Sequence, residues 1–224
     1  MKKITILPET TLNPITLIGR RAGICWGADI TNDEKNYKRG LDCILSNHGR
    51  VLEFINIEAV IEGYSARAIR EWYTHIGGSP TRLQGSTRYI DYSDFQYITP
   101  HSLKTEEQLK LYEQTMKVIA ENAKLLEEGG VPREDTALLL PLGMRTIIVD
   151  KRNGRNVIDM SRQRMCKRAY WEYRELFGDY LCRLRQLSSE WDTLINLTMM
   201  PKCEYLGYCP EKHSCGRKNR KEEA

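Results

Sequence analysis

Residues 80–89, which read Pro-Thr-Arg-Leu-Gln-Gly-Ser-Thr-Arg-Tyr, bring groups suited to nucleotide binding into one short segment. The two arginines can each fork onto a phosphate or a carbonyl edge, and the glutamine can pair with an amide-like ring edge. The hydroxyls of the serine and the second threonine, with the backbone N–H groups beside them, can cradle an anion. These groups therefore suit a nucleotide site, and a solvated loop whose arginines pair with surface acids is an equally open alternative.

The same stretch resembles the signature of the flavin-dependent thymidylate synthases, which reads Arg-His-Arg, a spacer, and then Ser-x-Arg-Tyr. His75 stands in the place of the central histidine, and residues 86–89 (Ser-Thr-Arg-Tyr) match the end of the motif. Thr74 and Ile76 replace the flanking arginines, two residues are inserted, and residues 83–84 (Leu-Gln) replace the usual Asn-Glu. The pattern resembles a recurrent variant of the motif within that family.

Two further segments continue the resemblance. Residues 48–53 match a His-x-x-x-x-Glu segment of the family, which implies that Arg50 contacts the flavin phosphate and that His48 lies close to flavin and substrate. Residues 153–172 align without gaps with the family's Asn-x-Arg-x-x-x-Asn…Arg…Glu segment. Together with the signature, these matches cover most of the chain in order.

The resemblance implies separate roles along the segment that starts at Asn153. Asn153 and Arg155 match residues that bind flavin, and Asp159 replaces an asparagine that does so. Arg164 matches the arginine that holds the uracil ring and favours its N3-ionised form. On a helix with about 100° per residue, Arg155 and Asp159 lie about 40° apart, whereas Arg155 and Arg164 lie about 180° apart. One helix would thus face two ligands or two subunits; the alternative is a cationic face that is solvated or lies on nucleic acid.

For the whole protein, the resemblance implies an α+β fold, a mixed or antiparallel sheet packed with long helices in a single domain. It implies a homotetramer with FAD at subunit interfaces, which converts dUMP to dTMP with methylenetetrahydrofolate as carbon donor and NADPH as reductant. Arg164 is the expected catalytic residue. Substrate contacts are expected from Glu71, Gln84, Gly85, Ser86, Thr87, Arg88 and Arg164. Cofactor contacts are expected from Arg50, Thr74, His75, Ile76, Asn153, Arg155 and Asp159.

The departures from the family pattern at Thr74, Ile76, Leu83 and Ala137 leave other functions open. Ala137 stands where the family usually places an arginine used for the substrate, so either Arg145 or Arg82 supplies that charge or the affinity differs. Ser86 is the only candidate nucleophile in the motif, and we assign it to substrate positioning because no base is visibly paired with it. The alternatives are a flavoenzyme of the same fold acting on another pyrimidine nucleotide or one-carbon donor, and a non-catalytic nucleic-acid-binding protein.

The composition suits one soluble domain of this kind. With 224 residues, 41% hydrophobic and 29% charged, the chain can bury a full core. No apolar run is long enough to span a membrane, and the apolar start is too short for a signal peptide, so a cytoplasmic location is expected. Seven cysteines spread over this length indicate reduced thiols. The net charge of +4 suits anionic ligands but is too small to indicate nucleic acid.

The elements that must position these groups follow from caps and periodicity. The β-branched and small residues of 11–26 predict strand and loop, and Asn32 predicts the cap of the next helix. Alternation over 54–62 predicts a strand, after which Ser65 caps a helix that leads to the signature loop. Residues 92–101 predict another strand.

The longest helix is expected after Thr105, where Thr-Glu-Glu-Gln forms a capping box. A strand over 144–149 should lead to the helix after Asn153, which is expected to continue, with a possible break at Gly178, to Leu197. The apolar stripe of the longest helix is interpreted as core and consists of Tyr112, Met116, Ile119, Ala123 and Leu126.

Residues 201–224 form a tail beyond the expected domain of residues 1–200. Cys203, Cys209, His213 and Cys215 could hold zinc, but their spacing differs from the paired C-x-x-C of a knuckle. We therefore expect no metal site and expect the tail cysteines to be dispensable for chemistry. The charged end from residue 216 is expected to fray.

Overall fold

The computed structural model describes residues 1–221 as an antiparallel sheet packed with helices, which confirms the expected single-domain α+β fold. The strands are β1 (Lys3–Ile6), β2 (Asn56–Ser65), β3 (Thr81–Gln84) and β4 (Arg145–Asn153). The helices are α1 (Pro14–Cys25), α2 (Asp33–Leu45), α3 (Ala66–Tyr73), α4 (Glu106–Glu128), α5 (Arg133–Thr136), α6 (Gly154–Arg164), α7 (Trp171–Arg185), α8 (Ser189–Thr198) and α9 (Lys202–Leu206), with 3-10 turns η1 (Gly49–Phe54) and η2 (Ala137–Leu139). No helix in this described part is long and apolar enough to cross a membrane.

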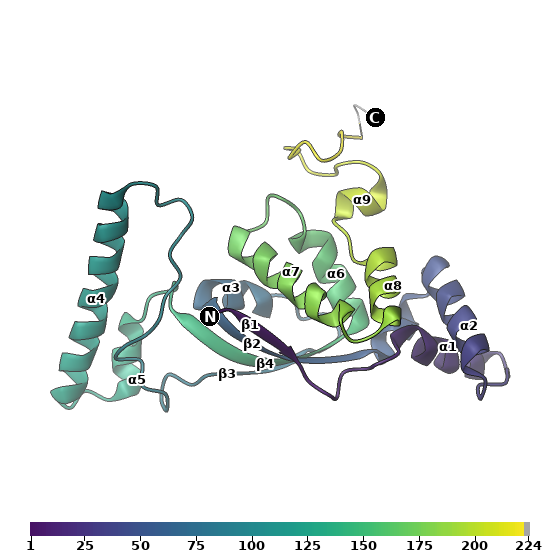
Figure 1. Cartoon of the computed structure of the whole chain (residues 1–224), viewed down its shortest axis with the longest axis horizontal. Helices are drawn as coiled ribbons and strands as arrows, with labels where there is room; N and C mark the ends of the chain where they lie inside the picture. Colours follow the sequence, from purple (N-terminus) through teal and green to yellow (C-terminus); the bar gives the residue numbers. More distant parts are fainter. Residues whose placement is uncertain (222–224) are drawn as a thin grey trace.

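The sheet has the strand order β1-β2-β4-β3, and each neighbouring pair is antiparallel. Val149 of β4 pairs with Val60 of β2 on one side and with Leu83 of β3 on the other. Because side chains alternate between the faces of a strand, Asp150 and Arg152 of β4 share its buried face. In Figure 1 the helices α3, α6, α7 and α8 lie together over one side of the strands.

Aromatic rings join α3 to α7 in the main core. Trp72 of α3 has its ring centroid 5.7 Å from that of Tyr173, 6.1 Å from Phe177 and 5.2 Å from Tyr180, all on α7. These four side chains are buried, and such ring pairs add stability beyond the apolar area that they bury. This packing fixes the C-terminal end of α3, which carries the first candidate site residues.

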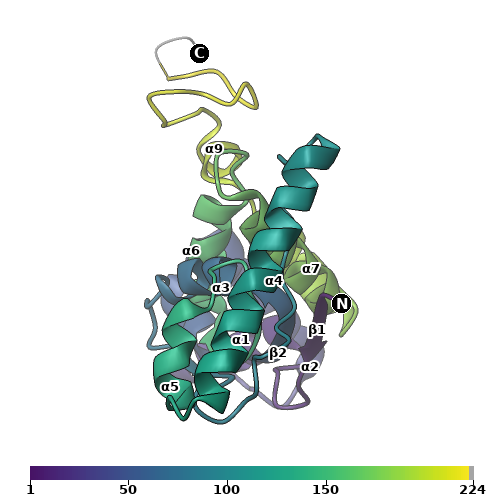
Figure 2. The ribbon, with the colours of Figure 1, turned by 90° about the vertical axis from the view of Figure 1, so that its left-hand side faces the viewer.

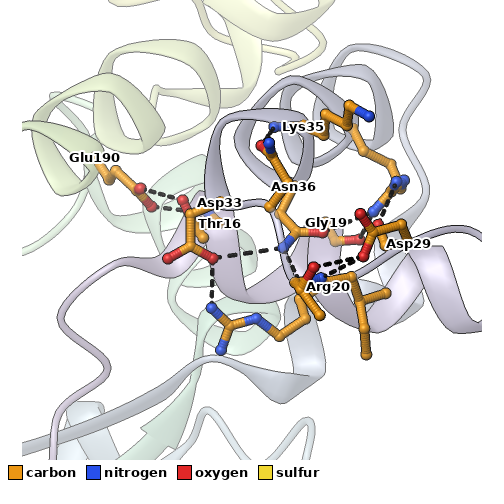
Figure 3. Close-up of polar contacts among 12 residues, drawn as sticks. Thr16, Gly19, Arg20, Asp29, Asp33, Lys35, Asn36 and Glu190 are labelled. Carbon is orange, nitrogen blue, oxygen red and sulfur yellow. Dashed lines mark hydrogen bonds and ion pairs between the residues drawn. The ribbon is translucent and has the colours of Figure 1, made fainter.

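Residues 11–26 are largely helical, so the strand predicted there is wrong. Pro14 occupies the first turn of α1, where its missing N–H costs nothing, and Glu190 of α8 accepts hydrogen bonds from the first backbone N–H groups (Figure 3). Gly19 lets α1 approach α2, because a Cβ there would lie 1.8 Å from the carbonyl oxygen of Asn36. A carboxylate distant in sequence and a close helix contact thus favour helix over the local strand preference.

The other predicted helix starts are confirmed. The side chains of Asn32, Ser65 and Thr105 each accept a hydrogen bond from the backbone N–H three residues later. Thr105 also forms the predicted capping box with Gln108 at the start of α4. These signals are local, since the cap and its partner lie within one turn.

Helix α4 stands apart from the sheet, at the far left of Figure 1 and in front of the sheet in Figure 2. Met116 and Ala123 are buried as predicted, and Met116 packs with Phe95 and Met144 in a small second core. Leu126, predicted as core, is 42% exposed. The core interpretation therefore holds for one side of α4, and further exposed apolar side chains on the helix are Leu111, Val118 and Leu125.

Three further predictions need correction. Residues 92–101 form an isolated bridge, Tyr97 with Met144, in place of a strand. The signature segment is not a loop throughout, because its first half is β3. The single helix predicted from Asn153 to Leu197 is three helices, α6, α7 and α8. The possible break at Gly178 does not occur, because α7 continues through that residue.

The described part of the tail, residues 201–221, folds back onto the turn after α6. Nη1 of Arg217 donates to the carbonyl of Met165 at 3.3 Å, and the N–H of Cys209 donates to the carbonyl of Asn219 at 2.7 Å. The prediction of a frayed end is therefore wrong for residues 216–221, while 222–224 lie outside the described residues. The division into a domain of residues 1–200 and a tail of 201–224 stays a prediction.

Candidate active site

Arg164, the last residue of α6, lies among the side chains that end α3. Its Nε donates to Nε2 of His75 at 2.8 Å, and its Nη1 donates to Oε2 of Glu71 at 2.9 Å. Its Nη2 donates to Oγ1 of Thr74 at 3.3 Å. The structure thus gathers four predicted site residues at one point, and the guanidinium keeps further N–H groups for a ligand.

The ring of Tyr173 packs against one face of the Arg164 guanidinium, in addition to the hydrogen bonds at its edge. The central carbon of the guanidinium lies 4.8 Å from the centroid of the Tyr173 ring, and the Arg164 side chain is 21% exposed. An arginine is positively charged at any working pH, and an aromatic face below the planar group restrains its orientation. The arrangement is a pre-placed cation that can oppose negative charge on a bound ring.

His75 acts as a neutral hydrogen-bond acceptor in this cluster. Burial, together with the charges of Arg164 and Arg152, lowers the pKa of His75 to about 4. At neutral pH the ring is therefore uncharged, and its Nε2 lone pair faces the N–H of Arg164. His75 positions Arg164 rather than exchanging a proton with it.

A buried ion pair beneath the cluster was missed from the sequence. Nε of Arg152 lies 2.6 Å from Oδ2 of Asp150, and neither side chain is exposed. Arg152 also donates to the carbonyls of Trp72 and His75, at 3.1 and 2.9 Å, so it fixes the backbone where α3 ends. The alternation along β4 could have predicted this pair, because Asp150 and Arg152 are two residues apart and so lie on the same, buried face of the strand.

The second group of predicted substrate residues lies elsewhere, against β4 and α5. Nε2 of Gln84 is 3.4 Å from Oγ1 of Thr146, and Nε of Arg88 is 2.7 Å from a carboxylate oxygen of Glu134. The hydroxyl of Ser86 accepts the backbone N–H of Arg88 at 3.2 Å. Figure 1 places α5 next to α4, on the other side of α3 from α6. Within a single chain, Arg88 therefore lies away from the cluster around Arg164.

The other members of this second group lie close by. The N–H of Gly85 donates to the carbonyl of Ile147 at 2.9 Å, which continues the β3–β4 pairing. Thr87 and Ala137 line the same small hollow beside α4. Arg133, four residues before Ala137, also lines this hollow, and its guanidinium lies 3.5 Å from the carbonyl of Tyr89. The structure thus brings an arginine that the sequence interpretation overlooked next to the signature segment.

Arg82 and Arg145, the two arginines expected to replace the family's charge at Ala137, are placed differently. Arg82 donates to the carbonyl of Tyr73 at 3.1 Å and lies 4.2 Å over its ring, so it supports the end of α3. Arg145 pairs with Ser65 at the start of β4, beside the cap of α3. Among Arg82, Arg133 and Arg145, it is Arg133 that lies beside Ala137.

Some of the predicted flavin residues lie around the start of α6, whereas Thr74 and His75 lie in the cluster at its end. Asn153 caps the helix by accepting the N–H of Asn156 at 2.8 Å. Gly78 has a φ of +73°, and a Cβ there would lie 2.2 Å from Nδ2 of Asn153, so glycine is required for this turn to reach the amide. A hollow of about 220 Å³ opens between this turn, η1 and the end of β4. Its polar lining includes Ser79 and Lys151.

Arg155 lies on the exposed side of α6, where its guanidinium covers Gly49, next to the exposed Arg50. Asp159, also exposed, forms an ion pair of 3.7 Å with Arg162. The start of a helix with asparagine and arginine donors beside it suits an anionic or polar-edged ligand. Ile76 is 71% exposed and offers this area apolar surface rather than a charge.

Comparison with known proteins identifies the family. The model of the family described as "Thymidylate synthase complementing protein" (Thy1) matches residues 7–188. The flavin-dependent thymidylate synthase of Pyrococcus furiosus is 30% identical over 239 residues, covering 99% of this chain and 96% of that protein.

Two solved structures share the fold. A UMP/dUMP methylase PolB from Streptomyces cacaoi, bound with 5-Br dUMP, has a TM-score of 0.71 at 13% identity and covers 89% of this chain and 96% of that chain. The flavin-dependent thymidylate synthase ThyX from Helicobacter pylori, complexed with FAD and dUMP, has a TM-score of 0.68 at 16% identity and covers 88% and 99%. Since the family model spans most of the sequence, the chain belongs to the thymidylate synthase complementing protein family, that of the flavin-dependent thymidylate synthases.

Proposed function

We propose that this chain is a flavin-dependent thymidylate synthase, a methyltransferase that reductively methylates dUMP to dTMP. Methylenetetrahydrofolate is the carbon donor, NADPH is the reductant and FAD is the carrier. The observation in the structure that carries the proposal is the fixed guanidinium of Arg164, which Glu71, Thr74 and His75 hold at the end of α3.

Arg164 is the catalytic residue of the proposal. Its free N–H groups fork onto the pyrimidine ring, and its charge opposes the negative charge that develops when the ring is activated. Glu71 and His75 prevent the guanidinium from turning, so little reorganisation is needed during the reaction. Gln84 to Arg88 hold the phosphate end of the nucleotide through one guanidinium, hydroxyls and backbone N–H groups.

The start of α6 holds the flavin in this proposal. The Gly78 turn, the cap Asn153 and the exposed Arg155 and Arg50 form a cradle of donors that fits the phosphates and polar ring edges of FAD. FAD, when bound, supplies the carrier chemistry for the one-carbon unit and the hydride. The residues of the chain supply binding and orientation.

A homotetramer with shared sites is the second part of the proposal. Arg88 pairs with Glu134 on α5, whereas Arg164 contacts the end of α3, so a site that uses both needs a second copy of the chain. Helix α4 supports this, because Leu111 and Leu125 are 67% and 63% exposed on a helix that stands apart from the sheet (Figure 2). Exposed apolar surface of this kind marks protein interfaces.

Arg133 replaces the missing family arginine at Ala137 in this proposal. The two residues lie four apart at the start and end of the same short helical segment and line one hollow beside the signature. A guanidinium reaching from residue 133 can therefore serve the phosphate that Arg88 binds. A cytoplasmic location is also part of the proposal, supported by seven unpaired thiols in the described residues.

Turnover of matched nucleotides tests the proposal. Purified protein is incubated with methylenetetrahydrofolate, NADPH and dUMP, UMP or dCMP, and methylated product is measured by chromatography. We expect dTMP from dUMP only, with no product when NADPH is omitted. A higher kcat/KM for UMP or dCMP would instead support a related pyrimidine flavoenzyme. A colourless protein without turnover that binds DNA with steep salt dependence would support the nucleic-acid alternative.

A further inference from the structure

Four of the seven cysteines meet at one hollow, and the proposed reaction uses none of their thiols. Cys166 lies in the turn between α6 and α7, Cys203 lies on α9, and Cys209 and Cys215 lie in the tail. They line one hollow of about 530 Å³, and Arg164 forms part of its wall. All four are free thiols.

The four thiols are withdrawn from solvent to different degrees. Cys203 and Cys209 are each 7% exposed, and Cys166 and Cys215 are half-buried in the lining of the same hollow. Thiolates that are brought together in a partly buried place are stabilised when a metal centre lies between them.

The tail lacks a core of its own. Between residues 201 and 221 the buried residues are Pro201, Cys203 and Cys209, and residues 207–221 carry no regular helix or strand. Small segments that cannot bury apolar surface are usually held by disulfides or by a metal. These cysteines are unpaired, so no disulfide holds this segment, and metal ligation would add to the hydrogen bonds that Arg217 and Cys209 make.

The charge around the hollow suits a negatively charged centre. A [4Fe–4S]²⁺ core with four thiolates carries a net charge of about −2. Glu211 is the acidic residue in the lining. The cationic side chains in the lining are Arg162, Arg164, Arg168, Lys202, Arg217 and Lys218.

The geometry favours a cluster over a single ion. Zinc draws its thiolates to about 2.3 Å from one point and is usually bound through C-x2–4-C pairs. In residues 1–221 no three His, Cys, Asp or Glu side chains are arranged to hold one ion. A cluster instead places a different iron under each thiolate, so its sulfurs stand farther apart around a larger centre. A hollow of about 530 Å³ between cysteines spaced by five residues in the tail fits this arrangement.

We propose that Cys166, Cys203, Cys209 and Cys215 hold a [4Fe–4S] cluster that fixes the tail against the α6–α7 turn, beside Arg164. This replaces the expectation of no metal, which considered His213 and not Cys166. His213 is exposed, and its carbonyl accepts a hydrogen bond from Arg168 at 3.1 Å. The fourth ligand therefore comes from a turn 37 residues before Cys203 in the sequence.

The test measures metal content and is independent of catalysis. Full-length protein is purified without oxygen and then treated with ferrous iron and sulfide, after which iron, acid-labile sulfide and zinc are quantified. We expect about four irons and four sulfides per chain. Cys166→Ser and Cys209→Ser should reduce both to below about one per chain. Cys25→Ser, which changes an exposed thiol on α1, is the matched control and should keep them.

Circular dichroism and FAD affinity show whether each variant is folded. A folded Cys166→Ser protein that has lost iron supports the cluster. The proposal is overturned if the wild-type protein takes up no iron, if it holds stoichiometric zinc instead, or if its tail cysteines form disulfides under anaerobic conditions. It is also overturned if Cys25→Ser loses as much iron as Cys166→Ser.

Discussion

Replacing Arg152 with methionine keeps most of the side-chain volume but removes the charge and all its N–H donors. The side chains of Arg152 and Asp150 are both 0% exposed, and they lie 2.6 Å apart. The remaining donors of Arg152 bind the carbonyls of Trp72 and His75 and Oδ1 of Asn156, at 3.1, 2.9 and 2.7 Å. The change therefore leaves one buried carboxylate and several oxygens without their partner.

The expected change in the free energy of unfolding follows from the cost of leaving a buried charge without its partner. Removing one partner of a buried pair costs roughly 3–5 kcal/mol, because the remaining charge is uncompensated. Asp150 limits the cost by taking up a proton, since burial already raises its pKa against the opposing effect of Arg152. We expect Arg152→Met to lower the free energy of unfolding by about 4 kcal/mol. The double variant Asp150→Leu, Arg152→Met removes both charges and should recover most of that loss.

Urea unfolding followed by far-ultraviolet circular dichroism at pH 7 measures these changes. All variants are compared at one protein concentration, because assembly shifts the apparent stability. Arg183→Met, on the exposed side of α7, is the control and should change stability by less than about 0.5 kcal/mol. A loss below about 1 kcal/mol for Arg152→Met, or a double variant less stable than the single one, would refute the reasoning.

Four other predictions concern the site. Arg164→Ala should lower kcat/KM for dUMP by on the order of a hundredfold, about 3 kcal/mol, and lysine should restore only part because it cannot fork across two atoms; an unchanged kcat/KM would remove Arg164 from catalysis. Arg155→Ala should weaken FAD binding in a fluorescence titration, whereas Arg183→Ala should leave it unchanged, and equal affinities would exclude Arg155 from the flavin site. Mixing Arg164→Ala with Arg88→Ala subunits should restore roughly a quarter of the wild-type activity if subunits share sites, and no recovery after proven reassembly would argue against sharing. Because the folded-state pKa of His75 is lowered from 6.5 to about 4, the unfolded chain binds a proton that the folded chain cannot, so the free energy of unfolding should fall as pH drops through that window. His75→Gln should flatten this slope, and an equal slope in both proteins would contradict the assigned pKa.

Short-range signals in the sequence were sufficient for several elements. Asn32, Ser65 and the Thr105–Gln108 capping box each start a helix where predicted, because the cap and its N–H partner lie within one turn. The alternation of β2 was read correctly for a similar reason, since neighbouring side chains report the two faces of a strand.

Long-range contacts decided the elements that were predicted wrongly. The β-branched residues of 11–26 form a helix because Glu190, far along the chain, caps α1 and because Gly19 permits close contact with α2. Leu126 of the predicted α4 stripe is 42% exposed, since only one side of that helix meets the second core. Periodicity can show that a face is apolar but not which neighbour covers it.

The sequence by itself determined the family, the order of the segments and the identity of the residues that could bind a nucleotide. Only the tertiary structure decided how they group: Arg164 with Glu71, Thr74 and His75, but Arg88 with Glu134. It also brought Cys166 to the tail cysteines and placed Arg152 under the site. The physical reason is that residue type and spacing fix local hydrogen bonds and helix faces, whereas contacts between distant segments depend on how the whole core packs.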